Sequence, residues 1–388
     1  MSLSQSLTIP DTLAITLHRV KKYCHAYGLD FPTRGYPVYE TAPNNHWVAG
    51  FWPGMLWLSY AATQDEDFRW QAEALFPSFI ERLDQRVDLS HDLGFLYMLG
   101  ARPAWMLTRN QVACDLAIRA AQELVKRFNP GGNFIQAWGE IGEKPEAGRM
   151  IVDCLMNLPL LYWASEETGN SAFREVAHLH AITSMRYLVR SDGSTYHTFF
   201  LDPETGKPIG RKTAQGYADE SLWTRGQAWA IHGFALSAEW LDDAEFLAVA
   251  QKTADCFLDE SPIDKTPLWD LRLPDNAPKY IDSSAGAIAA CGLLRLAKLS
   301  GQSAYRRQAE VLVGTLIAEC FETDDARTGL LKHGAQHVME GFVDDYLIYG
   351  DYFFLEALLT ISNQTFDLWG PGSRTSEISR ESSKTVSD

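Results

Sequence analysis

Nearly apolar helical segments alternate with amphipathic ones along the chain. The segment 50–62 is almost wholly apolar, which predicts a helix buried on all sides. The next segment, 68–83, carries apolar residues at helical spacing on one face and charged residues on the other. This pairing of a buried with a half-buried helix recurs. The predicted pairs that follow are 92–107 with 111–128, 153–165 with 172–189, 224–240 with 244–258, and 283–299 with 304–321.

The two ends of the chain supply a sixth pair. Helical patterns run from Pro10 to about Tyr27 and over 346–361. An open solenoid would need polar terminal helices, whereas neither of these is more polar than the rest. We therefore predict an all-α (α/α)6 barrel of six helical hairpins, forming one catalytic domain over residues 1–365. Residues 366–388 are rich in Ser, Thr, Arg and Glu, so we expect a disordered polar tail.

Composition narrows the classes of partner. The chain has 388 residues, of which 46% are hydrophobic, so it can bury a large core. Its net charge of −16 argues against nucleic acid and anionic membranes, because both require a basic face. The six cysteines lie in apolar helical segments without ligand spacing, which indicates reduced core residues. With neither a signal-peptide pattern nor a membrane-length apolar run, a cytoplasmic location is expected.

Two aspartates stand at equivalent places in neighbouring repeats. Asp153 lies within the apolar segment 150–165, and Asp92 stands just before an apolar run, 153 − 92 = 61 residues earlier. Either acid could be a helix cap. In a closed ring, however, all inner helices run in one direction, so the residues at their starts meet at one mouth. We expect that mouth to gather Asp92, Asp153, Thr224 and Ser283.

The segments before the inner helices combine tryptophans with amides and histidines. The tryptophans in or beside them are Trp47, Trp52, Trp138, Trp223 and Trp229. Together with two carboxylates, such groups are typical of acid–base chemistry on a sugar, because aromatic rings stack on the sugar ring and amides bind its hydroxyls. The alternative is that the tryptophans only plug the end of the barrel.

Two further side chains have a structural and a functional interpretation. Arg225, at the start of an inner helix, is either a carboxylate clamp or half of an ion pair, and we favour the clamp. His197 is either a core histidine or part of the mouth. No phosphate-binding, zinc-protease or nucleophile-elbow motif is present, so nothing calls for a metal or a nucleotide.

The motifs together are specific to one family. From about Leu13 to Ile361, the chain closely resembles the unsaturated glucuronyl hydrolases, glycoside hydrolase family 88. The resemblance is carried, in the family's order and spacing, by HDLGFLY, NFIQAWG, IVDCLMNLPLLYWA, STYHTF, LWTRGQAW, DSSAGAIAACGLL and GDYFFLEALL. It implies an (α/α)6 barrel, a cytoplasmic enzyme without a cofactor, and a substrate ending in a 4,5-unsaturated uronic acid left by a polysaccharide lyase.

The resemblance also implies roles for individual residues. Asp153 would be the general acid and base, and Asp92 the second essential carboxylate. The unsaturated ring would be surrounded by Trp47, His91, His197, Gln215, Trp223, Arg225 and Trp229; Trp138, in NFIQAWG, is a further substrate-binding candidate. In the segment WVAGFW, Ala49 replaces an acid common in the family, which implies a change at the edge of the pocket.

The C4=C5 bond of such a substrate is an enol ether, so we expect hydration of that bond rather than direct attack at the anomeric carbon. Two alternatives stay open. A sugar isomerase or epimerase on the same barrel would use paired histidines, for which the candidates are His91, His197, His333 and His337. A sugar-binding protein without catalysis would be favoured only if one of the two aspartates were missing.

Overall fold

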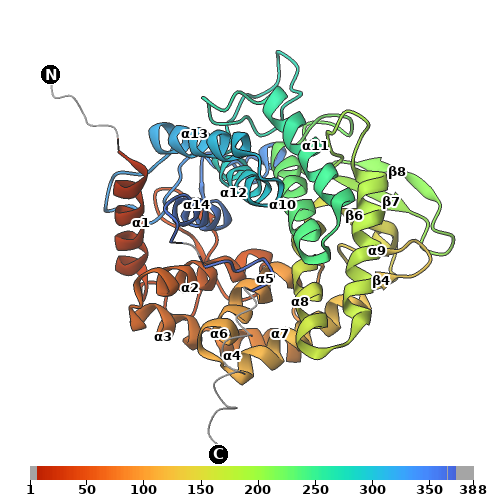
Figure 1. The fold of residues 1–388 in the computed structure, drawn as a ribbon, viewed down its shortest axis with the longest axis horizontal. Coiled ribbons are helices and arrows are strands. Elements are labelled where there is room, and N and C mark those ends of the chain that lie inside the picture. The colour runs from red at the N-terminus through yellow and green to blue at the C-terminus, as the bar shows by residue number, and fades with distance from the viewer. Residues whose placement is uncertain (1–6, 365, 373–388) are drawn as a thin grey trace, which may run out of the picture.

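Six helices form a closed inner ring in the computed structural model, which describes residues 7–364 and 366–372. They are α2 (Phe51–Thr63), α5 (Leu93–Gly100), α8 (Leu158–Thr168), α10 (Thr224–Leu241), α12 (Ser283–Ser300) and α14 (Ile348–Ile361). Each contacts the next, and α14 contacts α2, which closes the ring (Figure 1). The predicted (α/α)6 barrel is confirmed.

An outer layer of amphipathic helices surrounds this ring (Figure 1). Its helices are α1 (Ile9–Tyr23), α3 (Glu66–Ala74), α4 (Phe76–Asp84), α7 (Gln111–Lys126), α9 (Ser171–Leu188), α11 (Ala244–Glu260) and α13 (Ser303–Glu319). Helix α1 contacts α14, α2 and α13. The first and last helices therefore complete the sixth pair, as predicted from their apolar character.

Two predicted helices are each divided by a proline. The segment 68–83 breaks at Leu75, where Pro77 lies in the first turn of α4. The segment 92–107 breaks at Ala101, and Pro103 lies in the first turn of α6 (Arg102–Thr108). Proline lacks the N–H that a helix interior needs but fits a first turn, so each proline begins a new helix.

The prediction of one helix over residues 150–165 is wrong for the first half of that segment. Residues Arg149–Ile151 form strand β6, and Val152–Met156 form a 3-10 helix, η3. Helix α8 begins only at Leu158, with Pro159 in its first turn. Strand β6 pairs antiparallel with β7 (Thr198–Leu201), which holds this stretch extended. Asp153 therefore lies in a short 3-10 helix rather than in the first turn of an α-helix.

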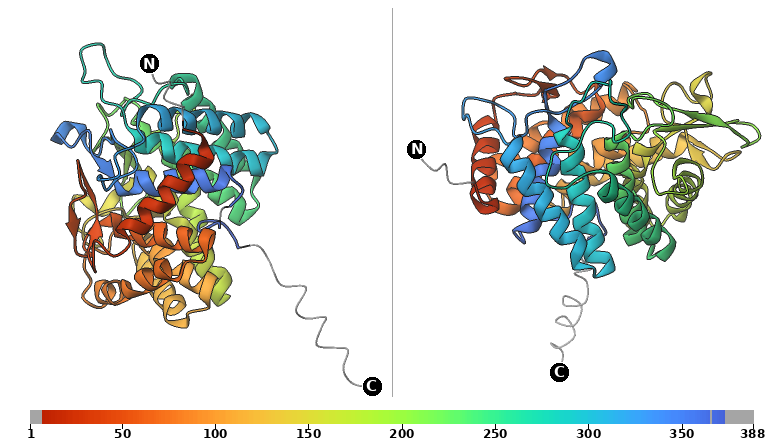
Figure 2. Two further views of the ribbon diagram at one scale, coloured as in Figure 1. Left: turned by 90° about the vertical axis from the view of Figure 1, so that its left-hand side faces the viewer. Right: turned by 90° about the horizontal axis from the view of Figure 1, so that it is seen from above.

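Short strands and 3-10 turns cluster in the connections at one end of the barrel (Figure 2). The sheet β6–β7–β8 is completed by β8 (Pro208–Lys212). The other pairs are β1 (Phe31–Pro32) with β3 (Thr41–Ala42), β2 (Arg34–Gly35) with β9 (Tyr346–Leu347), and β4 (Phe128–Asn129) with β5 (Phe134–Ile135). The remaining 3-10 helices are η1 (Trp47–Gly50), η2 (Glu146–Gly148) and η4 (Val338–Glu340).

The segment 366–372 is packed into the opposite end of the barrel. Trp369 is fully buried, and its ring stacks on Phe353 with centroids 6.0 Å apart. Arg102 donates to the carbonyls of Leu368 and Gly370 at 2.8 and 2.9 Å. The predicted polar tail therefore begins too early at 366, and its remainder, 373–388, lies outside the described residues.

The cysteines behave as predicted, since all six are free thiols buried in the structure. Across the described part of the chain, every helix is too short or too polar to cross a lipid bilayer.

Candidate active site

Both predicted aspartates line one cavity of about 80 Å³ at the loop-rich end of the barrel. Asp92 is the residue just before α5, and Asp153 lies on η3. The walls of the cavity are Trp47, His91, Asp92, Trp138, Asp153, Gln215, Arg225 and Gln336. The predicted site residues therefore meet in this cavity, with the exceptions of His197, Trp223 and Trp229.

A close approach between α5 and the turn after η3 brings the two aspartates together. A Cβ atom on Gly94 would lie only 2.2 Å from the Cα of Asn157, so no larger residue fits. The Asn157 side chain accepts a hydrogen bond from the Phe95 N–H at 2.7 Å. Its amide nitrogen donates to the Asp153 carbonyl at 3.4 Å. Asn157 thus joins the start of α5, beside Asp92, to the turn that carries Asp153.

The Asp92 carboxylate has several stabilising partners. It is 8% exposed, and burial raises its pKa to about 6. The Ser90 hydroxyl, which donates to Asp92 Oδ2 at 3.1 Å, acts in the opposite direction, as does the positive charge of Arg82. Asp92 therefore carries a negative charge at neutral pH.

Asp153 lacks such partners. Its Oδ2 atom is buried and receives no hydrogen bond from any described residue. Burial, and after it the nearby Asp92 carboxylate, raise the pKa of Asp153 to about 7, while Arg225 acts in the opposite direction. Asp153 thus retains its proton at a pH at which Asp92 has lost its own, which is the arrangement of a general acid beside a carboxylate.

His91 is neutral in this site. Its Nε2 lies 3.5 Å from Asp92 Oδ1, yet burial lowers the pKa of His91 to about 3, and Arg127 acts in the same direction. Arg127 donates four hydrogen bonds to the carbonyls of Leu89, Gln136, Ala137 and Gly139. It therefore fixes the segment before Asp92 against the segment that carries Trp138.

Arg225 forms an ion pair inside the protein. Its Nη1 donates to Asp282 Oδ2 at 2.6 Å and to the Ala335 carbonyl at 2.8 Å. Its Nη2 donates to Gln215 Oε1 at 2.6 Å and to the Gln336 carbonyl at 2.7 Å. Both terminal nitrogens already have protein partners, so the structure favours the ion-pair interpretation over the free clamp. Since Gln215 Oε1 accepts this bond, the Gln215 amide nitrogen remains available to a ligand.

Two predicted contact residues form a second layer behind the cavity. His197 and Trp223 lie face to face, with ring centroids 4.2 Å apart, and neither lines the cavity. The His197 Nδ1 accepts hydrogen bonds from the N–H groups of Ala214 and Gln215 at 3.0 and 3.2 Å. Burial lowers the pKa of His197 well below its ordinary range, so the ring is neutral and supports the backbone of Gln215.

Of the remaining predicted contact tryptophans, two line the cavity and one lies in the protein core. Trp47 and Trp138 line the cavity, and the Arg149 guanidinium lies 4.8 Å from the Trp138 ring. Trp229, by contrast, is fully buried and packs against Phe95 and Phe353, with ring centroids 5.2 and 5.4 Å away. The predicted contact between Trp229 and a ligand is not supported, because its ring lies below the cavity in the core. Ala49 is also buried, at 1% exposure, and does not edge the cavity.

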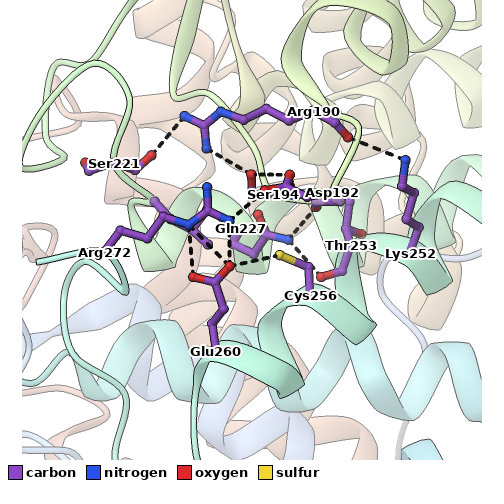
Figure 3. Close-up of polar contacts among 12 residues, drawn as sticks. Arg190, Asp192, Ser194, Ser221, Gln227, Lys252, Thr253, Cys256, Glu260 and Arg272 are labelled. Carbon is purple, nitrogen blue, oxygen red and sulfur yellow. Dashed lines mark hydrogen bonds and ion pairs between the residues drawn. The ribbon is translucent and has the colours of Figure 1, made fainter.

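An ionic network braces the turn before β7, the loop before α10 and helix α11 against one another (Figure 3). Arg272 donates to both carboxylate oxygens of Glu260, on α11, and to Asp192 Oδ2 at 2.8 Å. Arg190 donates to Ser194 Oγ at 3.0 Å and to the Ser221 carbonyl at 2.9 Å. The network joins the turn before β7 to the loop before α10.

Gln227, within α10, ties the same turn to the neighbouring helix. Its amide nitrogen donates to the Gly193 carbonyl at 2.9 Å and to the Thr253 carbonyl, on α11, at 2.7 Å (Figure 3). Buried Asp270 completes the support, since its carboxylate accepts hydrogen bonds from Tyr217, Ser221, Leu222 and Arg272. The loops behind the cavity are therefore held from several sides.

Sequence reasoning missed the residues that hold the site in place. Asn157 and Arg127 lie in segments read only for their apolar spacing, and Gln336 lies in a loop with no helical or strand pattern. Asp282 N-caps α12, for which Asp before an apolar run is a visible signal. Its second role, as the partner of Arg225, spans 57 residues and is visible only in the fold.

Larger cavities lie elsewhere but hold different chemistry. One of them, about 530 Å³ among α12, α13 and α14, is lined by Arg295, Glu356 and Asp367 at the far end of the barrel. Arg295 is paired there with Asp367 at 2.8 Å and with Glu239. Within 7–364 and 366–372, no cluster of three or more His, Cys, Asp or Glu side chains is placed to hold a metal ion.

Comparison with known proteins gives matches along almost the whole chain. The family model described as Glycosyl Hydrolase Family 88 matches residues 21–353. The chain is 44% identical to the unsaturated glucuronyl hydrolase of Bacillus sp. (strain GL1), over 93% of this chain and 97% of that protein. It is 37% identical to the unsaturated chondroitin disaccharide hydrolase of Streptococcus pyogenes serotype M1, over 93% of each.

Solved structures agree with these matches. The crystal structure of the unsaturated glucuronyl hydrolase from Bacillus sp. GL1 superposes with a TM-score of 0.88 at 42% identity, covering 94% of this chain and 99% of that one. A variant of the Streptococcus agalactiae unsaturated glucuronyl hydrolase, in complex with dGlcA-GalNAc6S, superposes with a TM-score of 0.80 at 32% identity, covering 95% of each chain.

Proposed function

The chain belongs to glycosyl hydrolase family 88, and on this premise we propose that it removes a 4,5-unsaturated uronic acid from the non-reducing end of lyase-generated oligosaccharides. It is a glycosidase, as its relatives are. The Bacillus and Streptococcus pyogenes relatives are called hydrolases of unsaturated glucuronyl compounds and of unsaturated chondroitin disaccharides. Hydrolysis of an unsaturated sugar compound is the feature that these names share.

One observation carries the proposal: two carboxyl groups share a buried cavity in unequal environments. Asp92 accepts a hydrogen bond from Ser90, whereas Asp153 Oδ2 receives none from the described residues. With pKa values raised to about 6 and about 7, Asp92 is the more readily ionised of the two acids and Asp153 the one that keeps its proton longer as the pH rises. A partly buried acid that keeps its proton near neutrality is suited to proton transfer to a weakly basic carbon.

The chemistry follows from the substrate's double bond. The C4=C5 bond is an enol ether, because C5 carries the ring oxygen. Asp153 gives its proton to C4, and the cation that develops at C5 is stabilised by that oxygen. Water then adds at C5 and returns a proton to Asp153. The hemiketal formed opens to a C5 ketone and a C1 hemiacetal, which expels the neighbouring sugar without attack at C1.

The other wall residues hold the ring in this orientation. Trp47 and Trp138 offer aromatic faces to the sugar, and Gln215 and His91 offer hydrogen-bonding groups. Asp92, ionised, stabilises the developing cation and orients water. Arg225 maintains the site's shape through Asp282 and Gln215 and adds a positive field near the uronate carboxylate. His197 and Trp223 act through Gln215 and Arg225, whose guanidinium lies 4.7 Å from the Trp223 ring.

Substitution of the two aspartates by asparagine tests the proposal. Asp153→Asn and Asp92→Asn are each expected to fold and to lose turnover, measured as the disappearance of the ultraviolet absorbance of the conjugated double bond. The matched control is Asp351→Asn. Asp351 is another buried aspartate, whose pKa burial raises to about 7, but it lies on α14 outside the cavity wall. Activity per folded molecule in the control should persist; equal losses in all three variants would overturn the proposal.

The isomerase hypothesis is not supported. It needs a histidine that can hold a proton near neutrality, yet burial lowers the pKa of His91 to about 3 and that of His197 well below its ordinary range. His333 and His337 do not line the cavity. The binding-protein hypothesis required a missing aspartate, and both are in place.

We also propose that the enzyme acts in the cytoplasm. The support is its six free cysteines, all buried, a pattern typical of a reducing compartment. Fractionation of the producing cells, with activity assayed in each fraction, tests this; activity confined to the medium or cell envelope would contradict it.

A further inference from the structure

Ser90 stands directly behind the aspartate pair without touching the catalytic cavity. Its hydroxyl donates to Asp92 Oδ2 at 3.1 Å and accepts a hydrogen bond from the Asp92 N–H at 3.3 Å. The two bonds are compatible, because the first uses the hydroxyl proton and the second uses an oxygen lone pair. With the lone pair occupied by the backbone, the proton is directed to the carboxylate. A donor aimed in this way stabilises the ionised form of Asp92.

We propose that Ser90 is a positioning residue that makes Asp92 the charged member of the pair and leaves the proton on Asp153. This inference rests on the proposed glycosidase function and adds a residue that acts only through Asp92. It assigns Ser90 a part in the reaction although Ser90 lies outside the cavity wall.

Position and rigidity support the assignment. Ser90 is 8% exposed, and its neighbours are fixed on both sides. Arg127 donates to the Leu89 carbonyl at 2.8 Å, and the His91 N–H donates to the Ala137 carbonyl at 3.0 Å. On its other side Ser90 borders a separate cavity of about 370 Å³. The hydroxyl is therefore held in place by its segment.

The environment of Asp153 is less favourable to a negative charge than that of Asp92. No described residue donates to Asp153 Oδ2. If the pair holds one negative charge, that charge is more stable on Asp92, because the Ser90 hydroxyl donates a hydrogen bond to it. The charge on Asp92 then disfavours a second one on Asp153.

Several other groups face Asp92, and all of them remain when Ser90 is changed. They are His91 and Asp88 from its own loop, Arg82 from α4, Arg127 at the end of α7, Asp153 and Cys154 from η3, and the Asn157 amide before α8. Asp153 is faced in addition by Arg225, from α10, and Tyr349, from α14. His91 is neutral, so the fixed positive charges are the arginines. Removing the Ser90 hydroxyl thus isolates one contribution.

The test is the pH dependence of kcat/KM in Ser90→Ala, Ser90→Thr and the wild-type enzyme. The acid limb reports the protonation of Asp92. Loss of a charge-assisted hydrogen bond is expected to move that limb of Ser90→Ala upward by about one pH unit. Activity at pH 6.5 should fall by several-fold, and at the new optimum it should largely recover. Ser90→Thr, which keeps the hydroxyl, should restore the limb to its wild-type position.

Ser237→Ala is the matched control. Ser237 is a buried serine of α10 whose hydroxyl contacts Tyr162 at 3.2 Å instead of an aspartate, so its loss should leave the pH profile in place. An unmoved acid limb in Ser90→Ala, with or without a lower melting temperature, would overturn the proposal and leave Ser90 a turn residue. If Asp153→Asn were fully active, the proposed function would fail instead, whatever Ser90→Ala showed.

Discussion

Two partly buried carboxyl groups at opposite ends of the barrel, Asp153 and Asp367, have opposite electrostatic environments. At the mouth, Asp153 has a buried oxygen without a donor among the described residues, and its pKa is raised to about 7. At the far end, Asp367 is bound by Arg295 at 2.8 and 3.0 Å and by the N–H groups of Trp369 and Gly370. There, although burial acts to raise it, Arg295 holds the pKa of Asp367 well below its usual range.

The difference shows that burial alone does not decide the state of an acid. A cation within hydrogen-bonding distance reverses the effect of burial at Asp367, because Arg295 stabilises the charged form of that acid. At the far end, the Arg295–Asp367 pair holds the backbone of Trp369 beside the inner helices. At the mouth, Asp153 Oδ2 receives no hydrogen bond from the described residues. Substitutions that change one end at a time should therefore separate activity from stability.

The largest effect is expected from Asp153→Asn. The amide keeps the shape of the side chain but cannot deliver a proton, and a proton-transfer role is typically worth about 10²–10⁴ in rate. We expect kcat to fall within that range while the melting temperature stays equal or rises, because a carboxyl group with a buried oxygen, unpartnered among the described residues, is removed. Turnover above a tenth of wild type would contradict the assignment.

Arg295→Met is expected to lower stability and to leave activity unchanged. It leaves Asp367 and Glu239 without their buried cation, and breaking a buried pair costs about 3–5 kcal/mol. Thermal unfolding should show this loss, with kcat per folded molecule unchanged. Lys298→Met is the control, since Lys298 pairs with the same Glu239 from a side chain that is 62% exposed. A fall in kcat without a fall in melting temperature would place Arg295 in the reaction.

The far-end pair also has a defined pH dependence of stability. Because the folded pKa of Asp367 lies below its unfolded value of about 4, its stabilising contribution is complete above that pH. The contribution is lost as the pH falls through the folded pKa. Acid titration of the melting temperature should therefore show a smaller decline in Arg295→Met than in wild type; parallel curves would mean that the pair is not ionic.

At the mouth, activity rather than stability should depend on pH. The rate needs Asp92 ionised and Asp153 protonated, so kcat/KM should be highest between their pKa values of about 6 and about 7. Beyond each limb it should fall about tenfold per pH unit. A profile that stays flat from pH 5 to 9 would show that these two groups do not carry the protons.

The smallest effect is expected in the brace behind the mouth. Arg272→Gln removes the links to Glu260 and Asp192 seen in Figure 3. Arg272 is partly exposed, so the cost in stability should be only about 0.2–1 kcal/mol. KM should nevertheless rise a few-fold, because the loop that carries Gln215 loses support. Arg69→Gln, which breaks similar exposed pairs on α3, should leave KM unchanged; equal effects would make the brace irrelevant to the site.

Much of this architecture is visible in the sequence because the inner helices have no polar face. The alternation of apolar with amphipathic helices, and terminal helices no more polar than the rest, predicted the ring. The common direction of the inner helices placed Asp92 and Asp153 at its mouth. Pro77, Pro103 and Pro159 each lie in the first turn of a helix, and a proline there is a sequence signal for a helix start. The prediction followed the apolar periodicity instead and continued one helix through each proline. Strand β6 was missed because three residues are too short for an alternating pattern.

Side-chain direction and distant partners could not be predicted. The segment LWTRGQAW shows that Trp229 and Arg225 lie near the mouth, but not that the indole packs on Phe353 below it. Nor does it show that Arg225 meets Asp282 across 57 residues. Trp369 looked like the start of a polar tail because its burial depends on helices far away in sequence. These features depend on tertiary packing, which local pattern does not encode.

The route of water is the most direct test of Asp153 as the proton donor to carbon. The reaction is run in heavy-oxygen water, and the label is located in the uronate product by mass spectrometry and carbon NMR before it exchanges. Protonation at C4 by Asp153 and addition of water at C5 predict the label on C5. Label on the anomeric carbon would mean direct hydrolysis of the glycosidic bond, and it would contradict proton transfer from Asp153 to C4.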